Sequence, residues 1–316
     1  MSPGLVTAGE TMGLVVQGAP GSPRNGEPMT FGIGGSESNV AIGVRRLGLP
    51  ATWIGRVGAD PPGDLILREL RAEQVEAIAA TDPSPTGLMV RWRPSGAHGR
   101  VTYYRRDSAG SHLCPDDIDP EVVRGAAVLH VTGITLALGP APADAIAHAV
   151  DVARAGGVTV SFDLNYRSAL WSPKEAAPAL EAAVRRADIV FAGELEAEII
   201  TETADPLQAA LALEKMIQTD HSQVVIKRGA DGCLARVNGV TIEQPAPAVS
   251  VVDTVGAGDA CVAGYLAELM SGAGPEARLR TAVAAGAFAV TVSGDWEGIP
   301  NRQSLTLLEA REPVIR

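Results

Sequence analysis

The stretch Asp253-Thr254-Val255-Gly256-Ala257-Gly258-Asp259 carries the strongest local signal in this chain of 316 residues. The following segment places small or apolar side chains on one helical face, which predicts a helix starting near Gly258: Ala260, Ala263, Ala267 and Met270. A Gly-x-Gly turn at a helix start exposes successive N–H groups to an anion, and the helix dipole adds positive potential there. Asp259 then lies in the first helical turn and faces whatever the amides hold. An acid at this position also serves as a helix cap, and the stretch alone leaves both interpretations open.

Upstream of this stretch, short apolar runs alternate with helical patterns. The runs are Leu5–Ala8, Ala127–Val131, Val158–Phe162, Ile189–Ala192 and Val224–Lys227. Because they lack polar alternation, they are typical of parallel strands buried on both faces. Helical patterns lie between them at Asp144–Arg154, Lys174–Arg186 and Pro206–Gln218. This alternation predicts a doubly wound α/β sheet.

Two stretches interrupt the alternation. Residues 12–31 are rich in Gly and Pro, and residues 86–106 contain two predicted strands, Leu88–Arg93 and Arg100–Arg106, around a turn. A hairpin inserted into an α/β chain is either a lid over a site or a surface decoration. We expect a lid.

The composition narrows the class of protein. Hydrophobic residues make up 46%, and 26 basic against 37 acidic residues give a net charge of -11, which argues against nucleic acid as the main partner. The three cysteines have no paired or metal-like spacing, which favours a reducing compartment. Neither a signal peptide nor a membrane span is recognisable in the sequence. We therefore expect a cytoplasmic protein.

The familiar phosphate-binding motifs are missing from the sequence. No lysine follows a glycine, as a Walker loop requires, and neither Gly-x-Gly continues into a dinucleotide fingerprint. A different candidate, Gly34-Gly35, precedes a helical pattern with Asn39 in its first turn and Gly48 as the expected carboxyl-terminal cap. Backbone N–H groups and an amide suit a polyhydroxylated ligand, but a tight turn with a helix cap has the same sequence.

Taken together, Gly34-Gly35 to Asn39 and Asp253–Asp259 resemble the paired signatures of ribokinase-like (phosphofructokinase-B type) carbohydrate kinases. The resemblance extends over nearly the whole chain. Three further stretches are similar to the 2-keto-3-deoxygluconate kinases of that family: Tyr103-Tyr104-Arg105 before Ser108-Ala109-Gly110, Val131–Ile134, and Asp163-Leu164-Asn165-Tyr166-Arg167 with Leu170-Trp171-Ser172. The resemblance implies one ribokinase-like domain over residues 1–316, a three-layer α/β/α sandwich with a small β-sheet lid from insertions at about 12–31 and 86–106.

The resemblance also implies roles for individual residues. Asp259 is the expected general base, and the amides of Gly256, Ala257 and Gly258 are the expected anion hole. ATP is expected beside these residues: Asn165, Arg167, Lys227, Gly229, Gly232, Gly256 and Gly258. Glu196 matches the acid that orders Mg²⁺, although Gly193 replaces the asparagine usual in that motif.

A keto-deoxy acid carries a carboxylate, which arginine binds through its planar fork. Arg167 follows a strand end, and Arg105 and Tyr103 lie on the same face of the expected lid. A surface ion pair for Arg167 and simple packing for Tyr103 are the alternatives. The full set expected to bind the sugar acid is Gly34, Gly35, Asn39, Tyr103, Arg105, Arg167 and Asp259.

Two further positions affect the expected specificity. Glu10 stands where many neutral-sugar kinases have Asp, and Met89 replaces an aromatic residue common in the subgroup. We expect Mg²⁺-dependent phosphorylation of 2-keto-3-deoxy-D-gluconate by ATP, in a homo-oligomer such as a dimer. The alternatives are a fructokinase, ribokinase or nucleoside kinase, or a non-catalytic sugar-sensing protein on this fold.

Overall fold

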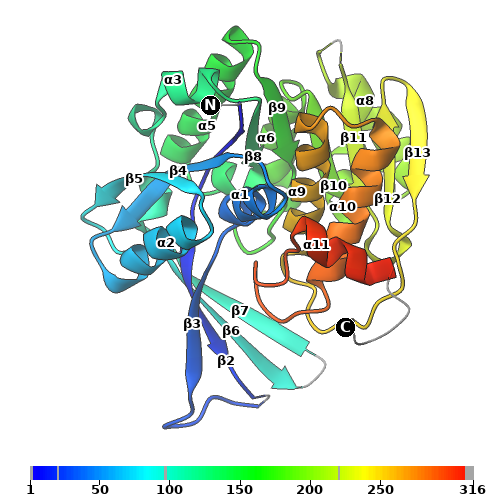
Figure 1. Ribbon diagram of the computed structural model, residues 1–316. Coiled ribbons are helices and arrows are strands. Elements are labelled where there is room, and N and C mark those ends of the chain that lie inside the picture. Colours follow the sequence, from blue (N-terminus) through cyan, green and yellow to red (C-terminus); the bar gives the residue numbers. More distant parts are fainter. Residues whose placement is uncertain (1–2, 20, 96–97, 220, 310–316) are drawn as a thin grey trace.

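The computed structural model describes residues 3–19, 21–95, 98–219 and 221–309 (Figure 1). Its main sheet has nine strands in the order β13-β12-β11-β10-β9-β8-β1-β4-β5. Seven are parallel: β1 (Leu5–Ala8), β4 (Ala51–Gly58), β5 (Glu76–Asp82), β8 (Val128–Thr132), β9 (Thr159–Asp163), β10 (Ile189–Gly193) and β11 (Gln223–Lys227). At one edge β12 (Cys233–Val237) and β13 (Val240–Gln244) add an antiparallel hairpin.

Helices cover both faces of this sheet. One face packs against α1 (Ser36–Arg46), α2 (Pro61–Ala72), α9 (Ala257–Met270) and α10 (Pro275–Ala289). The other packs against α3 (Pro120–Arg124), α5 (Pro140–Ala155), α6 (Pro173–Val184), α7 (Glu194–Thr201) and α8 (Pro206–Met216). Along β10, Ile189 and Phe191 enter the first core and Val190 and Ala192 the second. Burial on both faces explains the continuous apolar runs, and the predicted α/β/α architecture is confirmed.

A second sheet of four strands, which we call the small sheet, projects from the main body (Figure 1). Its order is β3-β2-β6-β7, with β2 at Met12–Gln17, β3 at Met29–Gly34, β6 at Leu88–Ser95 and β7 at His98–Tyr104. Residues 96 and 97 of the expected turn lie outside the described residues. The residue pattern predicted β6 and β7 as strands, whereas residues 12–31 were assigned to the small β-sheet lid only through the family resemblance and without strand bounds. The parallel partner of β2, β6, comes from distant sequence.

Local signals fix several helix starts. The Asp60 side chain accepts a hydrogen bond from Gly63 N at the start of α2, and Ser172 forms a capping box with Glu175 at α6. Short helical segments complete the chain: α4 (Gly133–Leu136) and α11 (Arg302–Leu305). Within the described ranges, no helix combines the length and apolar character needed to cross a membrane.

Candidate functional site

The predicted site residues converge on the carboxyl edge of the parallel strands. Glu10 follows β1, Asn165 follows β9, and Gly229 follows β11. The amino terminus of α9 approaches the same edge, since the Lys227 ammonium at the end of β11 lies against Gly258. Ligands of open α/β sheets bind at this edge, so the fold brings the expected residues to a suitable place.

Asp259 is held by side chains from α1. Its Oδ1 accepts a hydrogen bond from Ser36 Oγ at 2.7 Å, and its Oδ2 accepts one from Asn39 Nδ2 at 2.8 Å. Burial raises the pKa of Asp259, while these hydrogen bonds and the charges of Arg167 and Lys227 oppose the rise. The two signatures, more than 200 positions apart, therefore form one polar cluster.

Two asparagines of this cluster differ in their hydrogen bonding. Asn39 Oδ1 is buried with no partner among the described residues, so it can accept a hydrogen bond from a ligand hydroxyl. Asn165, in a left-handed conformation with φ 40°, donates from Nδ2 to Ser36 Oγ at 2.6 Å. Sequence reasoning assigned Asn165 to the nucleotide, whereas the structure connects it through Ser36 to Asp259.

Asp295 is a second carboxylate that sequence reasoning missed. It lies in the loop after α10, and its Oδ2 is 3.3 Å from Asn39 Nδ2. Burial, followed by the nearby charge of Asp259, raises the pKa of Asp295 to about 7. Asp295 has no strand or helix pattern around it that could have predicted this position.

The backbone at the amino terminus of α9 packs closely against the loop that carries Asp295. Gly256 has φ 75°, in the region that favours glycine, and a side chain there would collide with the carbonyl oxygen of Asp295. In the described part of the chain no side chain caps α9 at Gly256. The first N–H groups of α9, those of Ala257, Gly258 and Asp259, therefore remain available to a ligand.

Lys227 adds a fixed positive charge beside this turn. Its Nζ lies 2.6 Å from Asp163 Oδ2, and an added Cβ at Gly258 would be 3.6 Å from the same nitrogen. Burial disfavours the ammonium charge, but the carboxylates of Asp163 and Glu196 raise the pKa of Lys227, so it stays charged. The family resemblance assigned Lys227 to the nucleotide turn, and in the structure its ammonium group lies beside Gly258 at the start of α9.

The turn after β11 contains Gly229 at φ 55° and Gly232 at φ 85°. A side chain at Gly232 would collide with the backbone of residues 244–246, which accounts for the glycine. Across the site, Glu196 Oε2 accepts the N–H of Gly193 at 2.7 Å and caps α7, and its Oε1 lies 3.9 Å from Arg167 Nη1. The Arg167 side chain is 44% exposed, so its guanidinium can still reach a ligand.

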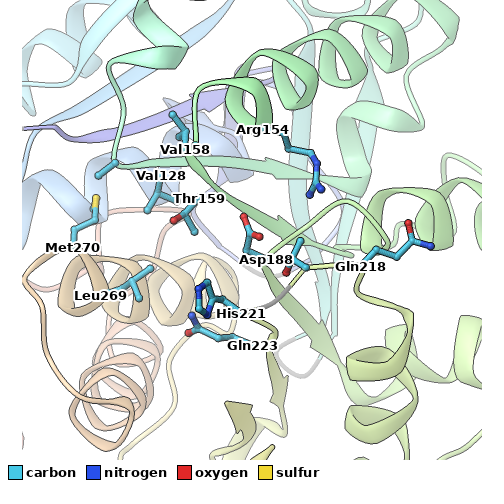
Figure 2. A pocket seen from close by; sticks show the side chains of 13 residues that line it. Val128, Arg154, Val158, Thr159, Asp188, Gln218, His221, Gln223, Leu269 and Met270 are labelled. Carbon is cyan, nitrogen blue, oxygen red and sulfur yellow. The ribbon is translucent and has the colours of Figure 1, made fainter. Parts of the chain in front are cut away.

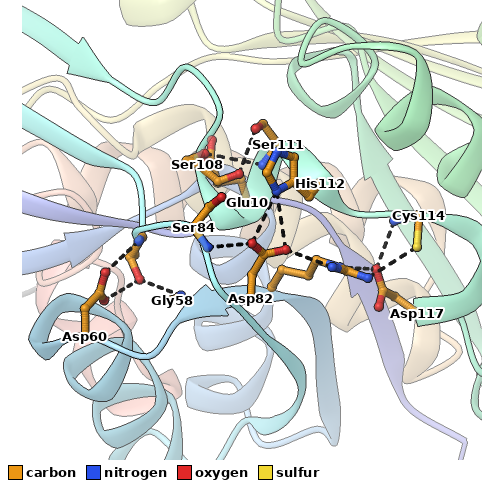
Figure 3. Close-up of polar contacts among 12 residues, drawn as sticks. Glu10, Gly58, Asp60, Asp82, Ser84, Ser108, Ser111, His112, Cys114 and Asp117 are labelled. Atoms are coloured by element: carbon orange, nitrogen blue, oxygen red, sulfur yellow. Dashed lines mark hydrogen bonds and ion pairs between the residues drawn. The ribbon is translucent and has the colours of Figure 1, made fainter.

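Two carboxylates hold the small sheet where it joins the main body, the buried Glu10 and the half-buried Asp60 (Figure 3). Glu10 Oε2 accepts a hydrogen bond from Arg105 Nε at 2.7 Å, and Glu10 Oε1 accepts one from Ser108 Oγ at 2.5 Å. Arg105 lies over the ring of Tyr103, 5.6 Å from its centroid. Arg105 was expected to bind the carboxylate of the substrate, but its guanidinium is instead ion-paired with Glu10 through Nε and Nη2.

The segment leading into β6 is held by Asp60. Its two carboxylate oxygens accept hydrogen bonds from Thr86 N and Thr86 Oγ1, each at 2.7 Å, and Thr86 Oγ1 accepts one from Gly58 N (Figure 3). The small sheet is therefore anchored where it leaves the main body.

Gly34 and Gly35 lie between the small sheet and α1. A side chain at Gly34 would collide with Asp295 Oδ2 and Met89 Cε, and one at Gly35 would lie 2.6 Å from the backbone oxygen of Glu10. Met89 therefore packs against the paired glycines, in the place where the subgroup resemblance implied an aromatic ring.

A cavity of about 630 Å³ lies at the opposite end of the main sheet (Figure 2). It opens at the amino ends of β8 to β11, between Val128, Asp188 and Gln223. None of the predicted site residues lines it. Since parallel sheets bind ligands at the carboxyl edge, we place the functional site around Asp259 instead.

The donors present are compatible with Mg²⁺ bound mainly through phosphates. Among the described residues, no group of three or more His, Cys, Asp or Glu side chains could enclose a metal ion. Mg²⁺ usually uses one or two carboxylates, waters and substrate phosphates. Glu196 Oε1, which makes no contact closer than 3.9 Å with Arg167, suits such a partial role.

Comparisons with known proteins cover nearly the whole chain. The sequence model described as pfkB family carbohydrate kinase matches residues 4–302. The chain is 34% identical to a 2-dehydro-3-deoxygalactonokinase from Haloferax volcanii (93% of each chain covered) and 33% identical to a 2-dehydro-3-deoxygluconokinase from Bacillus subtilis (98% of this chain and 96% of the relative). The crystal structure of a PfkB protein from Polaromonas sp. JS666 superposes with a TM-score of 0.87 at 30% identity, covering 96% of this chain and 99% of that one.

Proposed function

The chain belongs to the pfkB family of carbohydrate kinases, and from that membership we propose that it transfers the γ-phosphoryl group of ATP to a keto-deoxy sugar acid. The proposed substrate is 2-keto-3-deoxy-D-gluconate, also called 2-dehydro-3-deoxygluconate. The products are ADP and 2-keto-3-deoxy-6-phosphogluconate. The observation that carries the proposal is the half-buried Asp259 carboxylate, held by Ser36 and Asn39 at the uncapped start of α9.

In this mechanism Asp259 accepts the proton of the substrate 6-hydroxyl as its oxygen attacks the γ-phosphorus. The bond from that phosphorus to the β,γ-bridging oxygen breaks, and ADP leaves with the electron pair. The N–H groups of Gly256, Ala257 and Gly258 stabilise the negative charge on the transferred group. Lys227, kept cationic by Asp163, adds positive charge on the same side.

The nucleotide would lie across the turn after β11. Gly229 and Gly232 give the backbone of this turn positive φ angles, which permit close approach to the nucleotide. Asn165 and Arg167, which follow β9, would contact the nucleotide from the other side. Glu196 would hold Mg²⁺ together with the phosphates. When bound, the ion neutralises phosphate charge.

The sugar acid would lie between α1 and the small sheet. Asn39 Oδ1 offers the buried acceptor that a sugar hydroxyl satisfies. Gly34 and Gly35, just before α1, let Asp295, Met89 and the backbone of Glu10 pack closely against this segment. Arg167 supplies an exposed cation for the carboxylate. Tyr103 completes the site from the small sheet, and Arg105, which is paired with Glu10, lies over its ring.

A panel of acceptors tests this assignment. The measurement is kcat/KM for 2-keto-3-deoxygluconate, 2-keto-3-deoxygalactonate, fructose, ribose and adenosine at saturating Mg-ATP. A site built to bind a polar group can reject an analogue lacking it by about 10⁴-fold, so the keto-deoxy acids should lead by a wide margin. Arg167→Ala should remove most of that preference. Fructose or ribose matching the acids would refute the acid specificity but leave the kinase activity standing.

We also propose that the chain forms a homodimer through the small sheet. Among the described residues, its edge strands β3 and β7 have no further strand beside them. Four large apolar side chains are exposed on these strands: Met29, Phe31, Val101 and Tyr104. Unpaired edges with apolar cover favour pairing with a second copy.

A further inference from the structure

Asp253, the first residue of the Asp253–Asp259 stretch, joins several loops through one carboxylate. Its Oδ1 accepts a hydrogen bond from Val255 N at 3.3 Å, and its Oδ2 accepts one from Gly294 N at 3.3 Å. The backbone N–H groups of Val252 and Asp253 donate to Val290 O at 2.8 and 3.2 Å. The segment leading into the anion-binding turn is thus tied to the end of α10 and to the loop that carries Asp295.

The small sheet contributes the cation that this carboxylate faces. Arg91, on β6, places Nη2 2.8 Å from Asp253 Oδ2, and the two side chains are only 8% and 11% exposed. The other terminal nitrogen of Arg91, Nη1, is buried with no partner in the described ranges. Such a buried pair is costly to disrupt, because removing one partner leaves the other charge without compensation.

The loop held by Asp253 shapes the catalytic cluster directly. Gly294 precedes Asp295, whose side chain contacts Asn39 and whose carbonyl oxygen packs against Gly256. Displacing this loop would therefore disturb both the turn before α9 and the side chain that holds Asp259. The charge of Arg91 also reaches Asp295, where it opposes the rise in the pKa of that carboxyl.

We propose that Arg91 is a positioning residue that couples the small sheet to the phosphoryl-transfer machinery, by fixing Asp253 and through it the anion-binding turn and Asp295. The inference rests on the proposed kinase function. It assigns to a residue of the substrate-covering sheet an effect on the chemical step. A sugar bound beneath a well-placed β6 would thus find the anion hole assembled, whereas a displaced β6 would leave Asp253 without its counter-ion.

The test combines single and double variants. Arg91→Met and Asp253→Asn should each lower kcat by at least about 10-fold, the scale of a charge-assisted hydrogen bond, while KM for the acceptor changes less. The double variant should be no worse than the more damaged single variant, because both changes break one interaction. Arg91→Lys should retain part of the activity, and millimolar guanidinium should partly restore Arg91→Ala. Arg100→Met, which removes an exposed charge from β7, is the matched control and should resemble the wild type.

A second readout needs no acceptor. Amide hydrogen exchange in residues 253–259 and 293–296 should be faster in Arg91→Met than in the wild type or in Arg100→Met. Three results would each overturn the coupling. They are a loss of kcat in the double variant equal to the product of the single losses, an effect confined to KM for the acceptor, and amide hydrogen exchange in Arg91→Met equal to that of the wild type. If the wild type phosphorylates no acceptor, the proposed function fails, and the exchange measurement still decides whether Arg91 fixes the turn.

Discussion

Replacing Ser36 with alanine should make Asp259 harder to ionise while leaving the Asp259 side chain itself unchanged. Ser36 Oγ donates to Asp259 Oδ1 at 2.7 Å and accepts from Asn165 Nδ2 at 2.6 Å. Within the described part of the chain, the change leaves the Asp259 carboxylate with the side-chain hydrogen bond from Asn39 alone. A hydrogen bond to a charged group is worth about 1.5–3 kcal/mol. Losing it disfavours the ionised carboxylate, whose pKa burial already raises.

The expected result is a change in pH dependence rather than a uniform loss. In Ser36→Ala the acidic limb of the kcat/KM profile moves to higher pH, because the base must be ionised to accept a proton. On that limb the loss should be about 10–100-fold, the same free energy expressed as a rate ratio, and activity should recover toward alkaline pH.

Ser38→Ala is the matched control for this experiment. Ser38 lies on the same turn of α1, but its Oγ donates to the backbone oxygen of Gly35 instead of to Asp259. Its acidic limb should coincide with that of the wild type. A Ser36→Ala enzyme whose limb does not move, or a Ser38→Ala limb that moves equally, would refute the proposed support of Asp259 by Ser36.

Glu10→Gln should lower the free energy of unfolding by about 3–5 kcal/mol in thermal or denaturant unfolding, since it leaves the buried Arg105 without its charged partner. Glu27→Gln is the control: Glu27 is half-buried in the loop between β2 and β3, its partner Gln17 is uncharged, and the change should be less than about 1 kcal/mol. Because the folded-state pKa of Asp295 is raised from 3.8 to about 7, the wild type should lose stability relative to Asp295→Asn as the pH rises from about 4 to about 7; parallel pH profiles of Tm would contradict this. Light scattering at micromolar concentration should give a dimer, and a monomer there would exclude the proposed pairing of small sheets.

Five strands of the main sheet were predictable because they are buried on both faces: β1, β8, β9, β10 and β11. Continuous apolar runs such as Ile189–Ala192 report that burial directly, and the helices between them begin at recognisable caps such as Ser172. The edge strands β5 and β13 are mostly half-buried or exposed and were not predicted. The bounds of strand β2 could not be predicted, because glycine and proline residues follow it and its parallel partner β6 lies over 70 positions away. Such pairing leaves no local periodicity in the sequence.

The candidate site was predictable only where a residue belongs to a motif. Asp259 and Asn39 were anticipated, but Ser36 and Asp295 were not, since their roles depend on contacts formed after folding. The ion-pair partner of Arg105 could not be predicted from the sequence either. Arg105 was expected to face a ligand carboxylate, and the fold brings Glu10, 95 positions away, to its guanidinium.

The kinetics of Asp259→Asn test the central claim most directly. The amide keeps the size of the side chain but cannot accept the hydroxyl proton, so the variant should fold and bind ATP with unchanged affinity by calorimetry. General-base catalysis contributes about 10²–10⁴-fold, and kcat for 2-keto-3-deoxygluconate should fall by at least that factor with little change in KM. A variant that keeps nearly the wild-type kcat would contradict the assignment of Asp259 as the base.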